Sequence, residues 1–493
     1  MYVRQGKELP ADIVNIRQEP ATMARMKIDK NTNPSRSESR RDFIKRAAAI
    51  GVAAPFIVRS SALGLAGNVA PSNRIAIGVI GCGEHGANWN IPRIFQCPEA
   101  QLIAICDVDA DRLKATKRKV DAYYGKKIGK GYVGCDPHDD FRDLIMRKDI
   151  DAVANCTPDH WHVIPAIMAA KAGKDVLCEK PLTLTIDEGK QLCKTVAEHK
   201  RVFQTASENR SIDTYIRICE LVRNGRIGKL QHIKVGLPGG NDSRGVNYEL
   251  RQPAPVPDGF NYDMWQGQAP LAPYAPARCH GSFRWNYAYS GGRLTDWGAH
   301  LIDLAQWGNG TQDTGPVEVH GKGEFPPPGD FFNTAYAFDV NYKYANGVTL
   351  NVSSGDPSIR FEGTDGWIGF DGWRAPLKAS NDKILKSEIE PDEIHLHRPK
   401  KVIAHNAPGS GEYFDFFDCI KTRKPCYAPA EVGHRTISVA HIGNISMRLG
   451  KKLQWNPDDQ QFVNDDEANA MLARKQREPW TIANTDEWIA ERA

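Results

Sequence analysis

A short apolar segment that runs into a glycine-rich turn constrains the fold of this chain more than any other feature. Residues 75–80 read Ile-Ala-Ile-Gly-Val-Ile, a continuous apolar run typical of a parallel strand covered on both faces. Gly81, Gly83 and Gly86 follow with Gly-x-Gly-x-x-Gly spacing. In this pattern the first glycine permits a tight turn, the second lets the backbone approach a pyrophosphate, and the third lets the next helix pack on the strand. The helix N-terminus then favours the anion.

Two further segments support a dinucleotide-binding site. Residues 101–106 form a second apolar strand that ends in Asp107, 21 residues after Gly86. A carboxylate at this place accepts hydrogen bonds from a ribose diol and repels a 2′-phosphate, so the sequence favours NAD over NADP. Residues 151–156 form another strand, and the alternation of strands and helices predicts an α/β chain.

A lysine follows the next short strand. Residues 175–178 lead into Glu179-Lys180-Pro181. Ligands of open α/β sheets bind outside the carboxyl ends of the strands, so we expect Lys180 to point into that crevice. Pro181 restricts the backbone of the lysine before it. Taken alone, a lysine before a proline is usually a surface residue.

An acid and a histidine form a second candidate pair. Asp296 and His300 are four residues apart, so on one helix both side chains share a face. Gly291 and Gly292 just upstream permit a close approach of the backbone to the cleft. The alternatives are an aspartate that caps a helix and a histidine that is merely packed.

Taken in order, these motifs resemble the Gfo/Idh/MocA oxidoreductases, a family that includes glucose–fructose oxidoreductase and inositol dehydrogenases. Thr157-Pro158 completes the set of N-terminal motifs, and residues 290–303 are similar to the family's active-site helix with its Asp-x-x-x-His pair. The resemblance covers nearly all of the chain from residue 73. Three further stretches resemble an exported bacterial branch of the family: 263–265, 431–435 (with His434) and 477–480.

The resemblance implies an α/β fold of two parts. The first is an N-terminal Rossmann domain with a doubly wound parallel sheet. The second is a C-terminal α/β domain with a large open, mostly antiparallel sheet that lines the substrate cleft and commonly mediates homo-oligomers, here a dimer or a tetramer. The predicted limits are 1–72 for a leader and linker, 73–206 for the Rossmann domain and 207–493 for the C-terminal domain.

The second half of the chain has the residue pattern that this fold requires. Polar and apolar residues alternate at 230–235, 335–340 and 348–352, which predicts strands with one covered face. Long loops rich in proline and glycine lie at 253–257, 270–276 and 326–329. Loops of this length usually serve as lids or interface arms.

The activity that the resemblance implies is hydride transfer between NAD(H) and a secondary alcohol or ketone of a sugar, glycoside or cyclitol. In this hypothesis His300 takes the hydroxyl proton, Asp296 orients the substrate and stabilises the imidazolium, and Lys180 stabilises the developing alkoxide. The predicted cofactor-binding residues are Gly81, Gly83, Glu84, His85, Gly86, Asp107, Thr157, Pro158, His162, Glu179 and Asn209. The predicted substrate-binding residues are Trp265, Arg284 and Trp285, although such aromatic residues can equally belong to a core or an interface.

Two alternatives use the same residues. The family also contains NAD-dependent glycosidases, which oxidise the sugar transiently, eliminate the aglycone, add water and reduce again. Those relatives carry a tyrosine-bearing segment where this chain has Leu294-Thr295-Asp296, which disfavours this activity. The other alternative is a redox-inactive sugar-binding protein that keeps NAD as a structural element.

The basic charge of the chain is concentrated at its N-terminus. Residues 1–72 hold 12 Lys or Arg and 6 Asp or Glu, whereas the rest of the chain is slightly acidic although the total is +4. This distribution disfavours a nucleic-acid partner, which usually requires a basic domain or stripe.

The N-terminal segment also predicts an export signal. Ser39-Arg40-Arg41-Asp42-Phe43-Ile44-Lys45 precedes an uncharged segment at 47–58, which resembles a twin-arginine signal and predicts a periplasmic protein. A basic amphipathic helix is the alternative, and the long segment before the signal leaves Met23 or Met26 as alternative starts. No apolar run reaches the ~18 residues of a membrane span.

Cysteine usage predicts neither disulfides nor a metal site. The chain has 11 cysteines, an odd number, with no Cys-x-x-Cys spacing and no Cys/His cluster of the zinc type. Several lie in apolar strands, where cysteine behaves as a small hydrophobic residue.

Overall fold

The computed structural model describes residues 73–128, 134–239, 247–404, 409 and 411–493. The predicted export signal and linker at 1–72 lie outside these residues. None of the helices in the described ranges has both the length and the apolar character of a membrane-crossing segment.

A parallel sheet of six strands forms the first half, in the order β3-β2-β1-β4-β5-β6. Each neighbouring pair is parallel, and the order turns back at β1, which pairs with both β2 and β4. The predicted doubly wound Rossmann sheet is therefore confirmed. The strands are β1 (Ile75–Ile80), β2 (Ala100–Cys106), β3 (Asp136–His138), β4 (Ala152–Asn155), β5 (Asp175–Cys178) and β6 (Phe203–Thr205).

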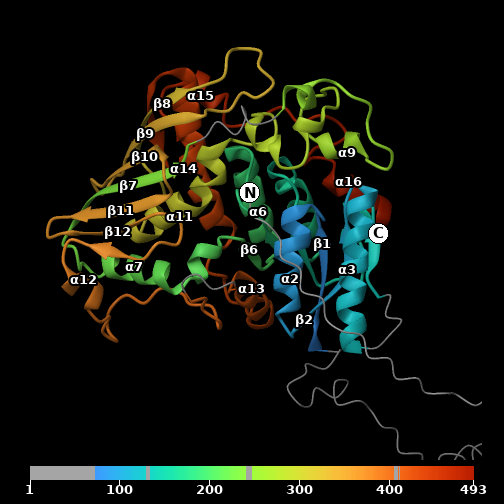
Figure 1. The fold of residues 1–493 in the computed structure, drawn as a ribbon, viewed down its shortest axis with the longest axis horizontal. Coiled ribbons are helices and arrows are strands. Elements are labelled where there is room, and N and C mark those ends of the chain that lie inside the picture. The colour runs from blue at the N-terminus through green and yellow to red at the C-terminus, as the bar shows by residue number, and fades with distance from the viewer. Residues whose placement is uncertain (1–72, 129–133, 240–246, 405–408, 410) are drawn as a thin grey trace, which may run out of the picture. The chain divides into compact units, whose positions relative to one another are not determined.

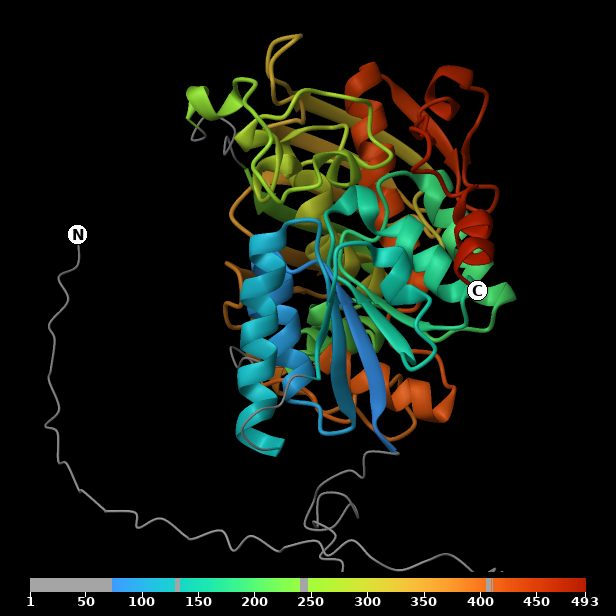
Figure 2. The same ribbon diagram turned by 90° about the vertical axis from the view of Figure 1, so that its right-hand side faces the viewer.

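Helices cover both faces of this sheet, which is why β1 is almost entirely buried (Figure 2). One apolar cluster joins the sheet to α2 (Ile91–Phe95), α3 (Ala110–Ile128) and α13 (Gly411–Thr422). A second cluster on the other face includes residues of α4 (Phe141–Ile145), α5 (Val163–Lys171), α6 (Ile186–Glu198) and α16 (Thr485–Arg492). Helices α13 and α16 come from the C-terminal half of the sequence, so packing crosses the predicted boundary at residues 206 and 207. The domain limits stay a prediction.

An open sheet of nine strands forms the second half, in the order β13-β12-β11-β7-β10-β9-β8-β14-β15. Its neighbours are antiparallel except β7 and β10, which confirms the predicted mostly antiparallel sheet. The strands are β7 (Leu230–Pro238), β8 (Glu318–Glu324), β9 (Ala337–Lys343), β10 (Thr349–Gly355), β11 (Ser358–Gly363), β12 (Trp367–Asp371), β13 (Lys378–Ala379), β14 (Lys452–Asn456) and β15 (Gln461–Phe462). The strand predicted at 335–340 lies two residues later, because the buried positions run through Phe338, Val340 and Tyr342.

Two long helices pack against each other and on the nine-stranded sheet, and the second of them also packs against α6 of the first half (Figure 1). They are α11 (Gly298–Asn309) and α14 (Ala430–Leu449), and together with α7 (Asp213–Arg223) they pack on the sheet in one large apolar cluster. A left-handed Gly450 with φ 63° ends α14. The remaining α-helices are α9 (Tyr262–Gln266), α10 (Arg293–Asp296), α12 (Asp382–Lys386) and α15 (Asp466–Asn469).

The cysteines agree with their expected structural role. All eleven are free thiols, and nine of them are buried. They fill apolar positions, for example Cys106 in β2 and Cys178 in β5, and burial raises the pKa of both thiols.

A buried ion pair ties three segments of the second half together. Arg210 Nε lies 2.8 Å from Asp303 Oδ2, and both side chains are almost completely buried. Thr436 Oγ1 of α14 donates to the same carboxylate at 3.0 Å, and the guanidinium also lies over the ring of Trp307. Because the charges satisfy each other away from water, loss of one partner leaves the other uncompensated.

We expect Asp303→Ala to lower the free energy of unfolding by about 3–5 kcal/mol, because it leaves the buried Arg210 guanidinium without its counter-charge. The matched control is Lys234→Ala, which removes an exposed pair with Glu362 (3.1 Å) and should cost at most about 1 kcal/mol. Urea denaturation of both variants measures the difference. A stability loss for Asp303→Ala no larger than for Lys234→Ala would contradict the assigned role of the pair.

Candidate active site

The glycine-rich loop is packed too closely against neighbouring backbone to accept side chains at two of its glycines. Gly81 has φ 97°, and a Cβ there would lie 2.6 Å from the carbonyl oxygen of Cys156. A Cβ at Gly86 would collide with the carbonyl oxygen of Gly81. Helical backbone begins at Glu84, directly after the loop, and continues through a π-helical turn, Gly86–Asn90, into α2. The open cradle at a helix start fits the pyrophosphate of a dinucleotide.

Asp107 lies at the end of β2 beside this loop. Its carboxylate accepts hydrogen bonds from the backbone N–H groups of Cys82 (2.6 Å) and Asp109 (2.9 Å). Burial raises the pKa of Asp107 to about 6, in spite of these bonds. The carboxylate is therefore mainly ionised at neutral pH and can accept further hydrogen bonds from a ribose diol.

One cavity of about 350 Å³ connects these parts. The predicted cofactor-binding residues that line it are Gly81, Gly83, Glu84, His85, Gly86, Asp107, Thr157, Pro158 and Glu179. Lys180, Trp265 and Arg284 line it as well, whereas the other two predicted catalytic residues, Asp296 and His300, do not. Part of the wall comes from residues 260–284, which pair with the first half through hydrogen bonds such as Asn261 N–H to the carbonyl of Val108 (2.9 Å).

Three predicted binding residues do not line this cavity. His162 is buried, and its ring nitrogens face the carbonyl oxygens of Pro181 (2.6 Å) and Thr157 (2.9 Å), so it holds two loops together. Asn209 donates to the carbonyl oxygen of His300 at 3.2 Å. The ring of Trp285 is buried, and the guanidinium of Arg293 lies over it. Tertiary packing therefore gives these residues supporting positions.

Glu179 is a buried carboxylate that orients its neighbours. His85 Nε2 and Asn90 Nδ2 both lie 2.9 Å from its Oε1 atom. Burial opposes ionisation, but the charges of His85 and Lys180 hold the pKa of Glu179 below its usual range. In return, Glu179 raises the pKa of His85.

Lys180 and Asp296 form a direct ion pair between the two halves of the chain. Lys180 Nζ lies 2.8 Å from Asp296 Oδ1, and Arg284 Nε lies 3.4 Å from the same oxygen. Burial opposes ionisation of Asp296, but these two cations hold its pKa below the usual range. Asp296 therefore stays ionised and holds the Lys180 ammonium at the cavity wall.

His300 lies near this pair, but it does not share one helix with Asp296 as the sequence predicted. The α-helical pattern is interrupted at Trp297, whose backbone stays right-handed, so Asp296 ends α10 while His300 belongs to α11. Among the described residues no hydrogen bond joins His300 to Lys180 or Asp296, and its buried Nδ1 has no partner. Burial and the Lys180 charge lower the pKa of His300 to about 4, so the imidazole is neutral at neutral pH.

Several residues that line the cavity were not predicted from the sequence. Arg112, His280 and Phe283 line the same cavity, and so does Trp89. A basic residue just after Asp107 is a signal that could have identified Arg112. His280 and Phe283 carry no comparable signal, because only the packing of the 260–284 segment brings them to the glycine-rich loop.

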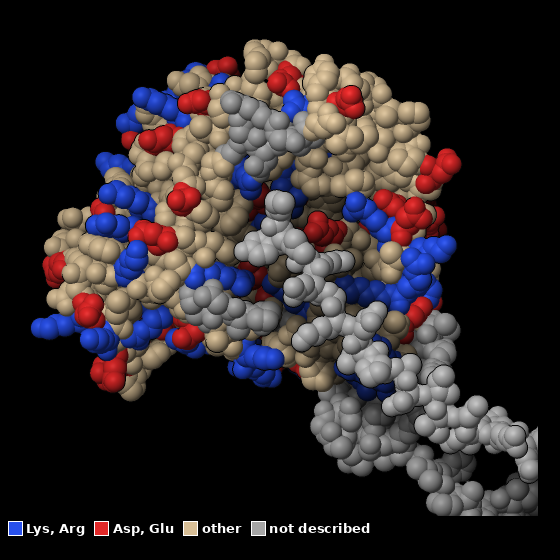
Figure 3. Space-filling model, in the orientation of Figure 1, with Lys and Arg blue, Asp and Glu red and all other residues tan. Residues whose placement is uncertain are grey.

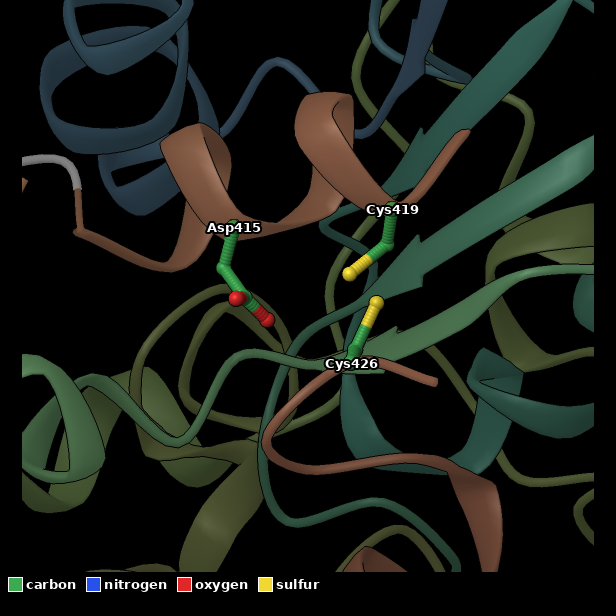
Figure 4. A group of neighbouring side chains, drawn as sticks. All are labelled: Asp415, Cys419 and Cys426. Atoms are coloured by element: carbon green, nitrogen blue, oxygen red, sulfur yellow. The ribbon is translucent and has the colours of Figure 1, made fainter. Parts of the chain in front are cut away.

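A second group of potential ligands lies away from this cavity (Figure 4). Donor atoms of Asp415, Cys419 and Cys426 all lie within 4.8 Å of one another. The carboxylate already faces His397 Nε2 (2.6 Å) and accepts from Tyr427 N–H (2.9 Å), and Cys419 Sγ lies 3.5 Å from the carbonyl oxygen of Pro425. The donors thus have protein partners, and the prediction of no metal site stays a prediction.

The charged residues of the outer surface are mixed in sign. Over the described part of the face in Figure 3, basic and acidic side chains lie side by side. Such a surface differs from the single-sign stripe that nucleic-acid-binding domains usually present.

Comparison with known proteins agrees with this geometry. The family model "Oxidoreductase family, NAD-binding Rossmann fold" matches residues 75–207, and "Oxidoreductase family, C-terminal alpha/beta domain" matches residues 214–482. The chain is 32% identical to a myo-inositol 2-dehydrogenase of Thermotoga maritima over 159 residues, which cover 32% of this chain and 44% of that protein. It is also 32% identical to a glycosyl hydrolase family 109 protein of Solibacter usitatus over 201 residues, which cover 39% of this chain and 44% of that protein.

A solved structure shows the same fold. The aldose–aldose oxidoreductase of Caulobacter crescentus, complexed with glycerol, superposes with a TM-score of 0.55 at 19% identity over 77% of this chain and 99% of that chain. The curated relatives, by contrast, are matched over less than half of their own length. Since the C-terminal family model alone matches more than half of the residues, the chain belongs to the Gfo/Idh/MocA family of oxidoreductases.

Proposed function

We propose that the protein transfers a hydride between NAD(H) and a secondary alcohol or ketone of a sugar, glycoside or cyclitol. The observation that supports this best is the Lys180–Asp296 pair at 2.8 Å, on the wall of the cavity that also contains the glycine-rich loop. A cation fixed at a cofactor-binding cavity is suited to stabilise a developing alkoxide. The match to a myo-inositol 2-dehydrogenase supports the substrate class.

Each residue of the site has a distinct part in this proposal. Lys180 donates a hydrogen bond to the reacting oxygen, and Asp296 holds the ammonium in place. His300 is neutral at neutral pH, and in this proposal its imidazole accepts the hydroxyl proton. Asp296 then stabilises the imidazolium that results.

The glycine cradle and Asp107 would hold the cofactor. NAD(H), when bound, supplies the carbon that accepts or donates the hydride. Asp107 would bind the ribose diol, and its negative charge favours NAD over NADP. Glu179 and His85 would frame the cradle next to Lys180.

Lys180→Ala should reduce turnover by about 10²–10³-fold or more, because it removes the donor to the reacting oxygen. NAD affinity should change little. NADH absorbance with a panel of sugars and cyclitols gives turnover, and calorimetry gives the NAD affinity. The control is Lys194→Ala, an exposed lysine of α6. Undiminished turnover in Lys180→Ala would contradict the proposal.

The low pKa of His300 sets the expected pH dependence. Because the folded-state pKa of about 4 lies below the ordinary value, the neutral base is present at neutral pH and is lost as the pH falls through about 4. The acidic limb of kcat/KM should therefore lie near pH 4, and His300→Asn should lower kcat and remove the limb. A limb at or above the ordinary histidine pKa of about 6.5 would be inconsistent with His300 as the base.

Cofactor choice provides a separate test. Asp107→Ser should lower the ratio of kcat/KM for NAD over NADP by about 10-fold or more, since it removes from the cavity the carboxylate that repels a 2′-phosphate. Asp111→Ser, an exposed acid at the start of α3, is the matched control. An unchanged ratio would show that Asp107 does not determine the choice between NAD and NADP.

A second candidate is an NAD-dependent glycosidase, which the match to the glycosyl hydrolase family 109 protein favours. Such an enzyme releases the aglycone from aryl glycosides without net NADH formation, whereas a dehydrogenase forms NADH and leaves the glycoside intact. A protein that gives neither product across the panel would instead fit the redox-inactive sugar-binding alternative. Export through the twin-arginine pathway to the periplasm, and assembly into a homo-oligomer, stay proposals that rest on the sequence and the family resemblance.

A further inference from the structure

Trp89 is an exposed tryptophan in the turn that follows the glycine-rich loop. Its side chain is 53% exposed, although it lies within the π-helical turn Gly86–Asn90. The next residue, Asn90, is buried and fixes this turn, because its amide donates to Glu179 (2.9 Å) and accepts from Tyr413 (2.7 Å). The indole therefore projects from a rigid support.

Trp89 lies where two cavities meet. The first is the cavity of about 350 Å³ with the glycine-rich loop and Lys180. The second, of about 330 Å³, lies between α2 and residues of the C-terminal half such as Arg374. Of the described residues, Trp89 alone lines both. A volume in the range of about 300–1,000 Å³ is sufficient for a ligand group of appreciable size.

The walls of the second cavity are polar and close to charge balance. Arg93 pairs with Glu412 and with Glu208, both at 2.6 Å, and Arg374 lies 3.7 Å from Glu208. The buried Nε of Arg374 has no hydrogen-bond partner among the described residues. The cavity thus combines the indole of Trp89 with paired guanidinium donors and carboxylate acceptors, which suits an uncharged ring with many hydroxyl groups.

His300 does not line the second cavity, but residues at or beside its wall act on this histidine. The ring of Trp373, the residue before Arg374, lies 5.3 Å from the ring of His300. Glu208, on its wall, acts electrostatically on His300, and the adjacent Asn209 bonds to the His300 carbonyl. Because Trp89 lines both cavities, a substrate that reacts next to Lys180 in the first cavity can extend past the indole into the second.

We propose that the substrate is a glycoside of at least two rings, with the second ring stacked on Trp89 and seated in the second cavity. This proposal rests on the proposed dehydrogenase function. In this proposal Trp89 and the Arg93–Glu208–Arg374 wall select larger glycosides over monosaccharides. Other residues carry the hydride-transfer step.

The test compares kcat/KM for gluco- and galacto-configured disaccharides with kcat/KM for the corresponding monosaccharides, measured as NADH formation. We expect the wild type to prefer disaccharides and Trp89→Ala to lower the disaccharide-to-monosaccharide ratio by about 10-fold or more. Trp89→Phe, which keeps an aromatic face, should retain most of the ratio. Tyr248→Ala removes an aromatic side chain that is 72% exposed and lines neither cavity, and should leave the ratio unchanged.

The outcomes separate this inference from the proposed function. If the wild type forms no NADH with any sugar, the proposed dehydrogenase function fails. If it oxidises sugars but does not discriminate between one and two rings, the two-ring inference is overturned while the function stands. Equal losses for both substrate classes in Trp89→Ala, together with weaker NAD binding by calorimetry, would assign Trp89 to the cofactor and also overturn the inference.

Discussion

The site depends on one buried ion pair that joins the two halves of the chain. The Lys180 ammonium follows β5 of the parallel sheet, and the Asp296 carboxylate ends α10 of the second half, 2.8 Å away. Removing two charges from water is costly, and each compensates for the other only if the two halves keep this register. The same contact holds the cation at the cavity wall, so an interaction that links the two halves also prepares the proposed chemistry.

Other buried charged groups hold the segments that surround the site. Arg210 and Asp303 pair at 2.8 Å and link the segment after β6 to α11, the helix that contains His300. Glu179 fixes Asn90 and faces His85, which sets the turn after the glycine-rich loop. These networks explain how a single rigid frame can position an exposed indole, a neutral histidine and a paired lysine around adjoining cavities.

Local patterns predicted the first half of the site well. A continuous apolar strand followed by Gly81, Gly83 and Gly86 required a parallel sheet and an open cradle, and the structure contains both. Predictions that depended on side-chain direction were less successful. Trp285 packs beneath Arg293 instead of lining the cavity, and the break at Trp297 separates Asp296 from His300. Residue type and spacing do not encode which neighbour from a distant segment covers a side chain.

The sequence by itself determined the two-sheet α/β fold, the glycine-rich cradle and the acid after the second strand, because strand periodicity and glycine spacing act locally along the chain. Only the tertiary structure decided that Arg284 joins Lys180 at Asp296, that the 260–284 segment walls the cavity, and that Trp89 lies between two cavities. These features arise where segments far apart in the sequence meet, and the free energy of that meeting comes from burial and charge pairing over the whole fold.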